Sequence, residues 1–158
     1  MKIRVSLGRI STLVGEGMLT FGTLGSCLAI VLYSLEKKVC IGAHAMLPTA
    51  PKECVRESIG RYVDSSIIYM HNVMKKQFNV RRVYSKIAGG ATLFKGLANS
   101  NCLNVGKRNW EVAQKTLSKL GVIIKAKHVL GDYGRTVSFK MPSAEMIIRT
   151  TKGRTIII

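Results

Sequence analysis

The sequence predicts an α+β domain in which two helices pack on a largely antiparallel system of strands. The chain of 158 residues is long enough to bury one core and too short for two. Its 47% hydrophobic residues and three prolines are typical of a globular protein. Strand-like runs occupy both ends of the chain, and two segments with helical periodicity lie between them. We therefore expect residues 1–158 to form a single domain.

The N-terminal part is expected to consist of strands. Residues 2–7 and the run around Thr20 alternate between polar and apolar side chains. Two apolar runs, 28–34 and 39–47, are separated by the charged connector LEKK, which is the pattern of a β-hairpin. Residues 17–35 carry no charge and have the length of a membrane span. The glycines, serines and threonines within them favour two buried strands instead.

Helical periodicity marks two later segments. Apolar residues recur at spacings of three and four from 54 to 78, with charged residues on the other faces. A strand over 82–88 follows and ends in a glycine pair. The second helix is expected over 105–120, with Asn104 at its N-cap and Gly121 after its C-terminus. Strand-like runs then occupy 122–130, 135–141, 145–151 and 155–158.

The charge balance of the chain is unusual. Against eight acidic residues there are 25 lysines and arginines, which gives a net charge of +17. A surface of this kind favours an anionic partner, such as nucleic acid, a membrane surface or an acidic protein. The sequence has no zinc-finger spacing and no RNP-like aromatic motif, and it offers few aromatic side chains for base stacking. We therefore expect no nucleic-acid partner.

The cysteines indicate a reducing compartment. The four cysteines include no C-x-x-C pair, and the N-terminus lacks the apolar core of a signal peptide. We therefore expect a cytoplasmic protein with free thiols and no membrane insertion. Cys54 and Cys102 are expected to be small buried hydrophobic residues.

One cysteine and one histidine become neighbours when the hairpin is paired. With Tyr33 opposite Lys38, Cys27 lies opposite His44, at a Cβ separation of about 4.5–5.5 Å. A register shift of two residues would leave the pair diagonal, and a shift of one would put it on opposite faces. A thiol beside an imidazole can form a thiolate–imidazolium pair, which attacks acyl carbon atoms. A buried cysteine and a core histidine would give the same pattern.

The residues around this pair bear on two kinds of chemistry. Gly25 and Ser26 would let a tight turn expose the sulfur of Cys27 and aim backbone N–H groups at an oxyanion. Cys27, Cys40 and His44 could converge on zinc, but the close-spaced ligand pairs and a fourth ligand are missing. We expect neither a metal nor a cofactor.

Five segments resemble those of one known family, in the same order along the chain. They are TLGSCLAIVLY at 23–33, IGAHAMLP at 41–48, KIAGGATLF at 86–94, NVGKRN at 104–109 and GDYGRTVSF at 131–139. Together they resemble the chemoreceptor glutamine deamidases of the CheD family. The resemblance implies a layered α/β/β sandwich with mixed, largely antiparallel sheets, which agrees with the predicted α+β class.

The resemblance also implies a reaction and two partners. The reaction is hydrolysis of specific glutamine side chains to glutamate, with release of ammonia, on the cytoplasmic helices of methyl-accepting chemoreceptors. Cys27 would be the nucleophile that forms a thioester, and His44 would be the base that activates water. The resemblance further implies docking to a CheC-type phosphatase, so a non-catalytic or weakly catalytic adaptor is the alternative function.

A threonine is the third member of the site that the resemblance implies. Many relatives place it six residues before the cysteine, where this chain has Phe21. Thr23 keeps the strand parity of that position and is the candidate, with Thr20 as the alternative. Both can equally be ordinary strand threonines.

Two further groups of residues are singled out by the sequence. Gly89 and Gly90, with Ser26, are expected to contribute to the binding site, the glycines through a close backbone approach. A turn at the end of a strand would explain the glycine pair as well. Arg108 and Arg135 either fix loops by hydrogen bonds to carbonyl groups or are solvated on the surface.

Overall fold

The computed structural model of the chain describes residues 1–93 and 104–158. The helical segments are η1 (Arg56–Arg61, a 3₁₀-helix), α1 (Val63–Lys76) and α2 (Val105–Lys119). The strands are β1 (Lys2–Val5), β2 (Ile10–Val14), β3 (Gly17–Leu24), β4 (Leu28–Ser34), β5 (Val39–Ala45), β6 (Tyr84–Gly89), β7 (Ile123–Val129), β8 (Arg135–Met141), β9 (Met146–Thr150) and β10 (Thr155–Ile157).

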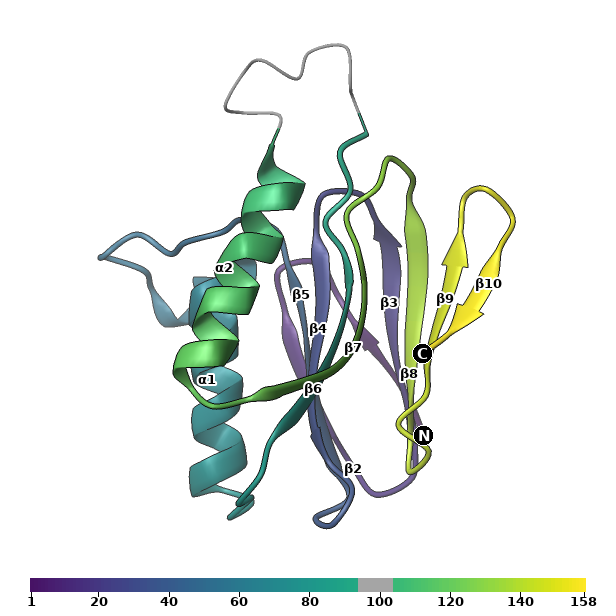
Figure 1. Cartoon of the computed structure of the whole chain (residues 1–158). Coiled ribbons are helices and arrows are strands. Elements are labelled where there is room, and N and C mark those ends of the chain that lie inside the picture. Colours follow the sequence, from purple (N-terminus) through teal and green to yellow (C-terminus); the bar gives the residue numbers. More distant parts are fainter. Residues whose placement is uncertain (94–103) are drawn as a thin grey trace.

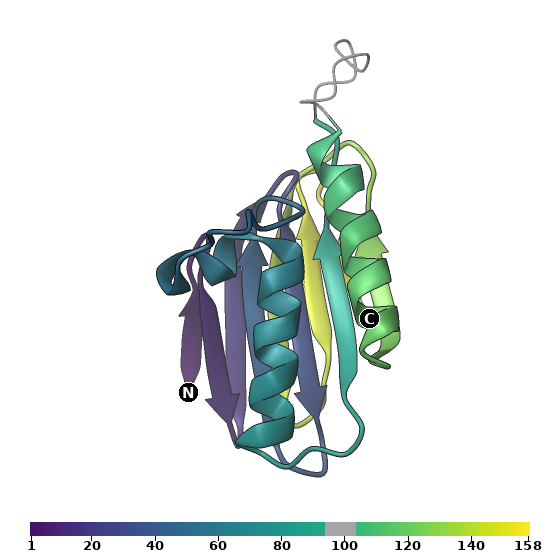
Figure 2. The same ribbon diagram turned by 90° about the vertical axis from the view of Figure 1, so that its left-hand side faces the viewer.

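The strands form two stacked sheets, and the long helices cover only one of them (Figure 1). The covered sheet has the order β2-β5-β4-β6-β7, and α1 and α2 lie on its outer face (Figure 2). The open sheet has the order β1-β3-β8-β9-β10. Among the strands of the described residues, β1–β3 and β6–β7 pair in parallel and the other neighbours are antiparallel. The predicted α+β class and the α/β/β layer order are therefore confirmed.

The central hairpin of the covered sheet is buried on both faces. Every residue of β4 and of β5 is buried. Along β4, Leu28, Ile30 and Leu32 pack against the helices. Their neighbours Ala29, Val31 and Tyr33 pack between the two sheets. This double burial explains why the hairpin strands read as continuous apolar runs rather than as alternating ones.

The hairpin register differs from the predicted one by two residues. Tyr33 lies opposite Cys40 rather than opposite Lys38, and Ala29 lies opposite His44. The reason is the turn. Lys38 adopts a left-handed conformation, with φ of 50°, and its N–H donates to the Leu35 carbonyl, so the strands stop at residues 34 and 39. An even shift keeps the same side chains on each face, as anticipated.

The predicted helix over 54–78 begins later than expected. Tyr62 has an extended backbone, and the α-helix starts at Val63. The Arg61 carbonyl accepts hydrogen bonds from the N–H groups of Met46 and Leu47, and Tyr62 forms an isolated β-bridge with Leu47. These tertiary bonds require extended backbone at the point where the periodicity predicts helix.

Other predicted elements are found close to their expected bounds. The uncharged run 17–35 contains the strands β3 and β4. In residues 1–93 and 104–158, no helix has both the length and the apolar character needed to cross a membrane. Asn104 directly precedes α2 but its side chain makes no capping hydrogen bond, whereas Gly121 has the left-handed conformation expected after a helix. The short strand β2 was not predicted separately.

Candidate active site

Cys27 and His44 lie at the same end of the covered sheet, between the two sheets. Cys27 directly precedes β4, is half-buried, and packs against the inter-sheet cluster of apolar side chains. His44, on β5, is only 4% exposed, and its ring lies 6.4 Å from that of Phe21 on the open sheet. Because Ala29 pairs with His44, Cys27 is one diagonal step away from the histidine, a Cα separation of about 7–8 Å in a regular sheet.

Burial favours the neutral forms of both groups. It raises the pKa of the Cys27 thiol above its ordinary value. It lowers the pKa of the His44 imidazole below its ordinary value. Both ring nitrogens of His44 are buried and have no side-chain partner among the described residues, while an interaction with the Val5 backbone partly offsets the lowering of the pKa. The free site therefore favours a thiol and a neutral imidazole rather than the ion pair expected from the sequence.

Neither candidate threonine faces His44. A β-bulge between Phe21 and Thr23 interrupts the alternation of β3, so Thr23 pairs with Thr136 and is exposed on the outer face of the open sheet. The parity predicted for Thr23 is therefore wrong. Thr20 lies on the same outer face, where its hydroxyl donates to the Ile3 carbonyl at 3.5 Å. The inner position beside the histidine is occupied by the ring of Phe21.

The glycine pair makes the close backbone approach that the sequence predicts. The Gly90 N–H donates to the Cys27 carbonyl at 2.9 Å, and the next N–H, of Ala91, donates to the Gly25 carbonyl at 3.0 Å. Gly89 has a φ of 117°, and a Cβ atom there would collide with the same Cys27 carbonyl. The end of β6 therefore holds the turn that carries Ser26 and Cys27 through backbone groups.

Asn109 ties the two halves of the site together and was not assigned a role from the sequence. It lies on α2, is fully buried, and donates from Nδ2 to the Ser26 carbonyl at 2.9 Å and to the Met46 carbonyl at 3.1 Å. One carbonyl directly precedes Cys27, and the other follows His44 by two residues. The only sequence signal for this asparagine is its place in the NVGKRN segment.

A buried arginine fixes the loop over residues 130–134. Arg135 is 1% exposed, and its Nη2 donates to the Leu130 carbonyl at 2.6 Å while its Nε donates to Nδ1 of His128 at 2.9 Å. Its guanidinium also lies over the ring of Tyr133, 4.6 Å from the centroid. Of the two alternatives that the sequence left open for Arg135, the structure shows the one in which it fixes a loop.

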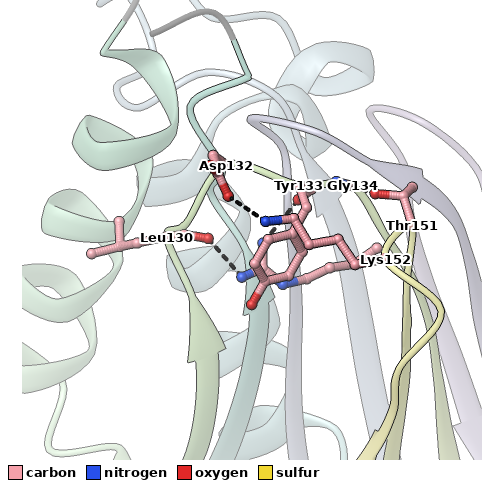
Figure 3. Close-up of polar contacts among 7 residues, drawn as sticks. Leu130, Asp132, Tyr133, Gly134, Thr151 and Lys152 are labelled. Atoms are coloured by element: carbon pink, nitrogen blue, oxygen red, sulfur yellow. Dashed lines mark hydrogen bonds and ion pairs between the residues drawn. The ribbon is translucent and has the colours of Figure 1, made fainter.

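The same loop is anchored on its other sides. Lys152 pairs with Asp132 at 3.3 Å, and the Gly134 N–H donates to the Thr151 hydroxyl (Figure 3). The loop carbonyl of Gly131 accepts from the N–H of Thr92, just after the glycine pair. Residues 130–134 are therefore bonded to the segment after β6 that holds the Cys27 turn, because the Leu130 N–H also donates to the Gly89 carbonyl.

The described residues contain no cluster that resembles a metal site. In residues 1–93 and 104–158, no three side chains of His, Cys, Asp or Glu lie where they could hold a metal ion. Burial raises the pKa of Cys40 to about 12, so this thiol stays protonated. Cys54 is only half-buried, so its expected full burial is wrong, and Cys102 lies outside the described residues.

Comparison with known proteins identifies the family. A family model described as CheD chemotactic sensory transduction matches residues 46–150, about two thirds of the chain. The chain belongs to the CheD family. A relative from Caldanaerobacter subterraneus subsp. tengcongensis, named "Probable chemoreceptor glutamine deamidase CheD", is 35% identical over 149 residues, which cover 94% of this chain and 92% of the relative.

Relatives from archaea carry the same name. The CheD protein of Methanococcus maripaludis is 35% identical over 153 residues, with 95% of this chain and 96% of the relative covered. That of Thermococcus kodakarensis is 31% identical over 158 residues, with 99% and 98% covered. The family model begins at residue 46, after Cys27 and His44, but the last of these CheD alignments spans both.

Proposed function

We propose that this chain hydrolyses glutamine side chains on the cytoplasmic helices of chemoreceptors, with Cys27 as nucleophile and His44 as base. The observation that carries the proposal is the placement of the two side chains on the same inter-sheet face, at one end of a doubly buried hairpin. The names of the CheD relatives support the choice of substrate.

The neutral state of the pair suits a stepwise proton transfer. Neutral His44 accepts the thiol proton as the sulfur of Cys27 attacks the amide carbon. The tetrahedral oxyanion then collapses, the C–N bond breaks, and the imidazolium gives its proton to the departing ammonia. A water molecule attacks the resulting thioester while His44 takes its proton. Collapse of this second intermediate breaks the C–S bond, returns the proton to the sulfur and leaves glutamate.

The turn before β4 can stabilise the oxyanion. Among the described residues, the N–H groups of Ser26 and Cys27 have no acceptor on another residue. Their peptide planes are fixed, because the Gly25 carbonyl accepts from the Ala91 N–H and the Ser26 carbonyl accepts from Asn109. Fixing the carbonyls orients the neighbouring N–H groups, and preorganised donors of this kind contribute about 3–4 kcal/mol each to acyl-transfer reactions.

Mass spectrometry of a receptor fragment tests the proposal. Incubation with the protein should convert glutamine to glutamate at specific sites and release equimolar ammonia. Cys27→Ala and His44→Ala should abolish the conversion, and Cys54→Ala, at a half-buried thiol outside the site, should leave it unchanged. Full conversion by the Cys27→Ala variant would exclude the mechanism.

Two observations favour a second candidate function. Phe21 stands where the resemblance implies a threonine, and His44 has no side-chain hydrogen-bond partner among the described residues. A histidine without an orienting side chain suits a weakly catalytic adaptor that docks a CheC-type phosphatase. Absence of any deamidation, together with tight binding of that phosphatase by wild type and Cys27→Ala alike, would favour the adaptor.

A further inference from the structure

The outer face of the open sheet carries a basic groove. No helix among residues 1–93 and 104–158 covers this face, in contrast to the covered sheet (Figure 1). The groove has a volume of about 660 Å³ and crosses β1, β3, β8 and β9. Lys2 and Arg4 line one side and Arg149 lines the other, and all three are exposed. None of the lining residues is acidic.

The floor of the groove is formed by small side chains. Thr20 and Gly22 come from β3, and Thr136 and Ser138 come from β8. Gly22 lies at the β-bulge, and a Cβ atom there would come within 3.8 Å of the Arg4 guanidinium. The bulge therefore gives a low floor directly beside a cation.

The width of the groove matches a helix. Its two basic sides lie on strands three neighbours apart, β1 and β9, which corresponds to about 14 Å at the usual spacing of about 4.8 Å. An α-helix with its side chains is about 10–12 Å wide. A helix lying between the two sides could present acidic residues to both, with its small residues on the floor.

The three cations have no competing partner within the described chain. The two ion pairs found among the described residues join Lys107 to Glu111 and Lys152 to Asp132. A second copy of the chain is an unsuitable occupant, because its net charge is also +17. Single-stranded nucleic acid is disfavoured because the one aromatic lining residue, Phe21, is 2% exposed and packs between the sheets.

We propose that this groove docks an acidic α-helix of a protein partner. The strand that forms much of its floor, β3, continues directly into the turn that carries Cys27. A helix lying along β3 would therefore extend toward the candidate active site. Taking that helix to be the receptor substrate rests on the proposed function, whereas the docking itself does not.

Binding of a labelled, Glu-rich helical peptide to the full chain tests the docking. The groove variant combines Lys2→Glu, Arg4→Glu and Arg149→Glu. The control combines Lys52→Glu, Arg81→Glu and Lys115→Glu, at exposed cations outside the groove, with the same change in net charge. In 0.1 M salt we expect the groove variant to raise the Kd at least about tenfold and the control to raise it less than about threefold. Unfolding curves should show that both variants fold before their Kd values are compared.

The outcomes separate this inference from the proposed function. If both variants weakened peptide binding equally, the docking proposal would be overturned, because the effect would then come from net charge and not from the groove. Groove-dependent binding of a DNA duplex without binding of the peptide would overturn it in favour of nucleic acid. Peptide binding needs no turnover, so absence of deamidation by the wild-type protein would contradict the proposed function and leave a groove-specific result standing.

Discussion

Asn109 is the single residue on which the geometry of the candidate site depends most directly. Asn109→Leu keeps a similar shape but leaves the Ser26 and Met46 carbonyls unsatisfied, at a cost of about 2–4 kcal/mol of unfolding free energy. We expect kcat for deamidation to fall at least about tenfold with KM little changed. The reason is that the turn with Ser26 and Cys27 would no longer be held in its reactive position, whereas its contacts with substrate would remain.

A control substitution on α2 separates the positioning of the Cys27 turn from the stability of the protein. Ala113→Gly destabilises α2 by about 1 kcal/mol without touching either carbonyl. At a temperature where both variants are folded, equal kcat values for the two would contradict a positioning role for Asn109.

Substitutions at Phe21 test whether His44 needs a side-chain hydroxyl to orient its ring. Phe21→Thr would place a hydroxyl in the position that faces His44, and Phe21→Val has the same shape without it. Both variants should lose about 3–4 kcal/mol of stability through the cavity that forms. We expect kcat to be higher in the threonine variant than in the valine variant, measured below the unfolding temperature of both. Identical kcat values would mean that His44 needs no hydroxyl partner.

The burial of the Cys27 thiol should change the pH dependence of its alkylation. Because its pKa is raised, we expect its alkylation by iodoacetamide in the free protein to accelerate with pH beyond the ordinary thiol range. Peptide mapping can follow Cys27 against Cys54. A rate that is already constant near neutral pH would show a preformed thiolate, as the sequence alone led us to expect.

At the scale of elements, the loop over 130–134 should weaken in acid. Burial, with the nearby charge of Arg135, lowers the pKa of His128, whose Nδ1 accepts from Arg135. Its contribution to stability is therefore present above the ordinary pKa of about 6.5 and is lost as the pH falls toward the folded value. Urea unfolding at pH 7 and pH 5 should show a smaller loss for His128→Gln than for wild type.

The groups around His128 and the other histidines of the chain determine what the comparison of wild type with His128→Gln measures. The groups found against His128 are Arg135 and the ring of Tyr133, 6.2 Å away. His44 and His71 also have lowered pKa values and contribute to the acid response of both proteins. Only the difference in acid destabilisation between wild type and His128→Gln therefore reports on the loop. If both proteins lost the same unfolding free energy between pH 7 and pH 5, His128 would not contribute to the weakening of the loop in acid.

Predictability from sequence differed between elements for physical reasons. Hydrophobic periodicity located nearly all strands and both long helices, because burial depends on that pattern. The hairpin register depends on the left-handed conformation of Lys38, and the start of α1 depends on hydrogen bonds to the Arg61 carbonyl. Neither feature changes the hydrophobic periodicity of the sequence, so the periodicity could not predict them. The Gly22 bulge likewise reversed the face of Thr23. Asn109 was missed because both of its acceptors are distant in sequence.

For the whole molecule, the net charge of +17 should govern capture of an acidic substrate. Long-range attraction is screened over about 10 Å at 0.1 M salt. Raising the salt concentration from about 0.05 to 0.5 M should therefore increase KM for a receptor fragment and leave kcat nearly unchanged. Steady-state kinetics across this range provide the measurement. A constant KM would leave the basic surface without a role in substrate capture.

The doubly buried hairpin has a consequence for how the chain folds. Alternate side chains of β4 complete two separate hydrophobic clusters, one beneath the helices and one between the sheets. Neither cluster can form fully until this strand is in place, and its partners β5 and β6 are joined to it by pairings of very different sequence separation. Folding should thus be a cooperative, all-or-none transition, slowed by the search for the more distant pairing.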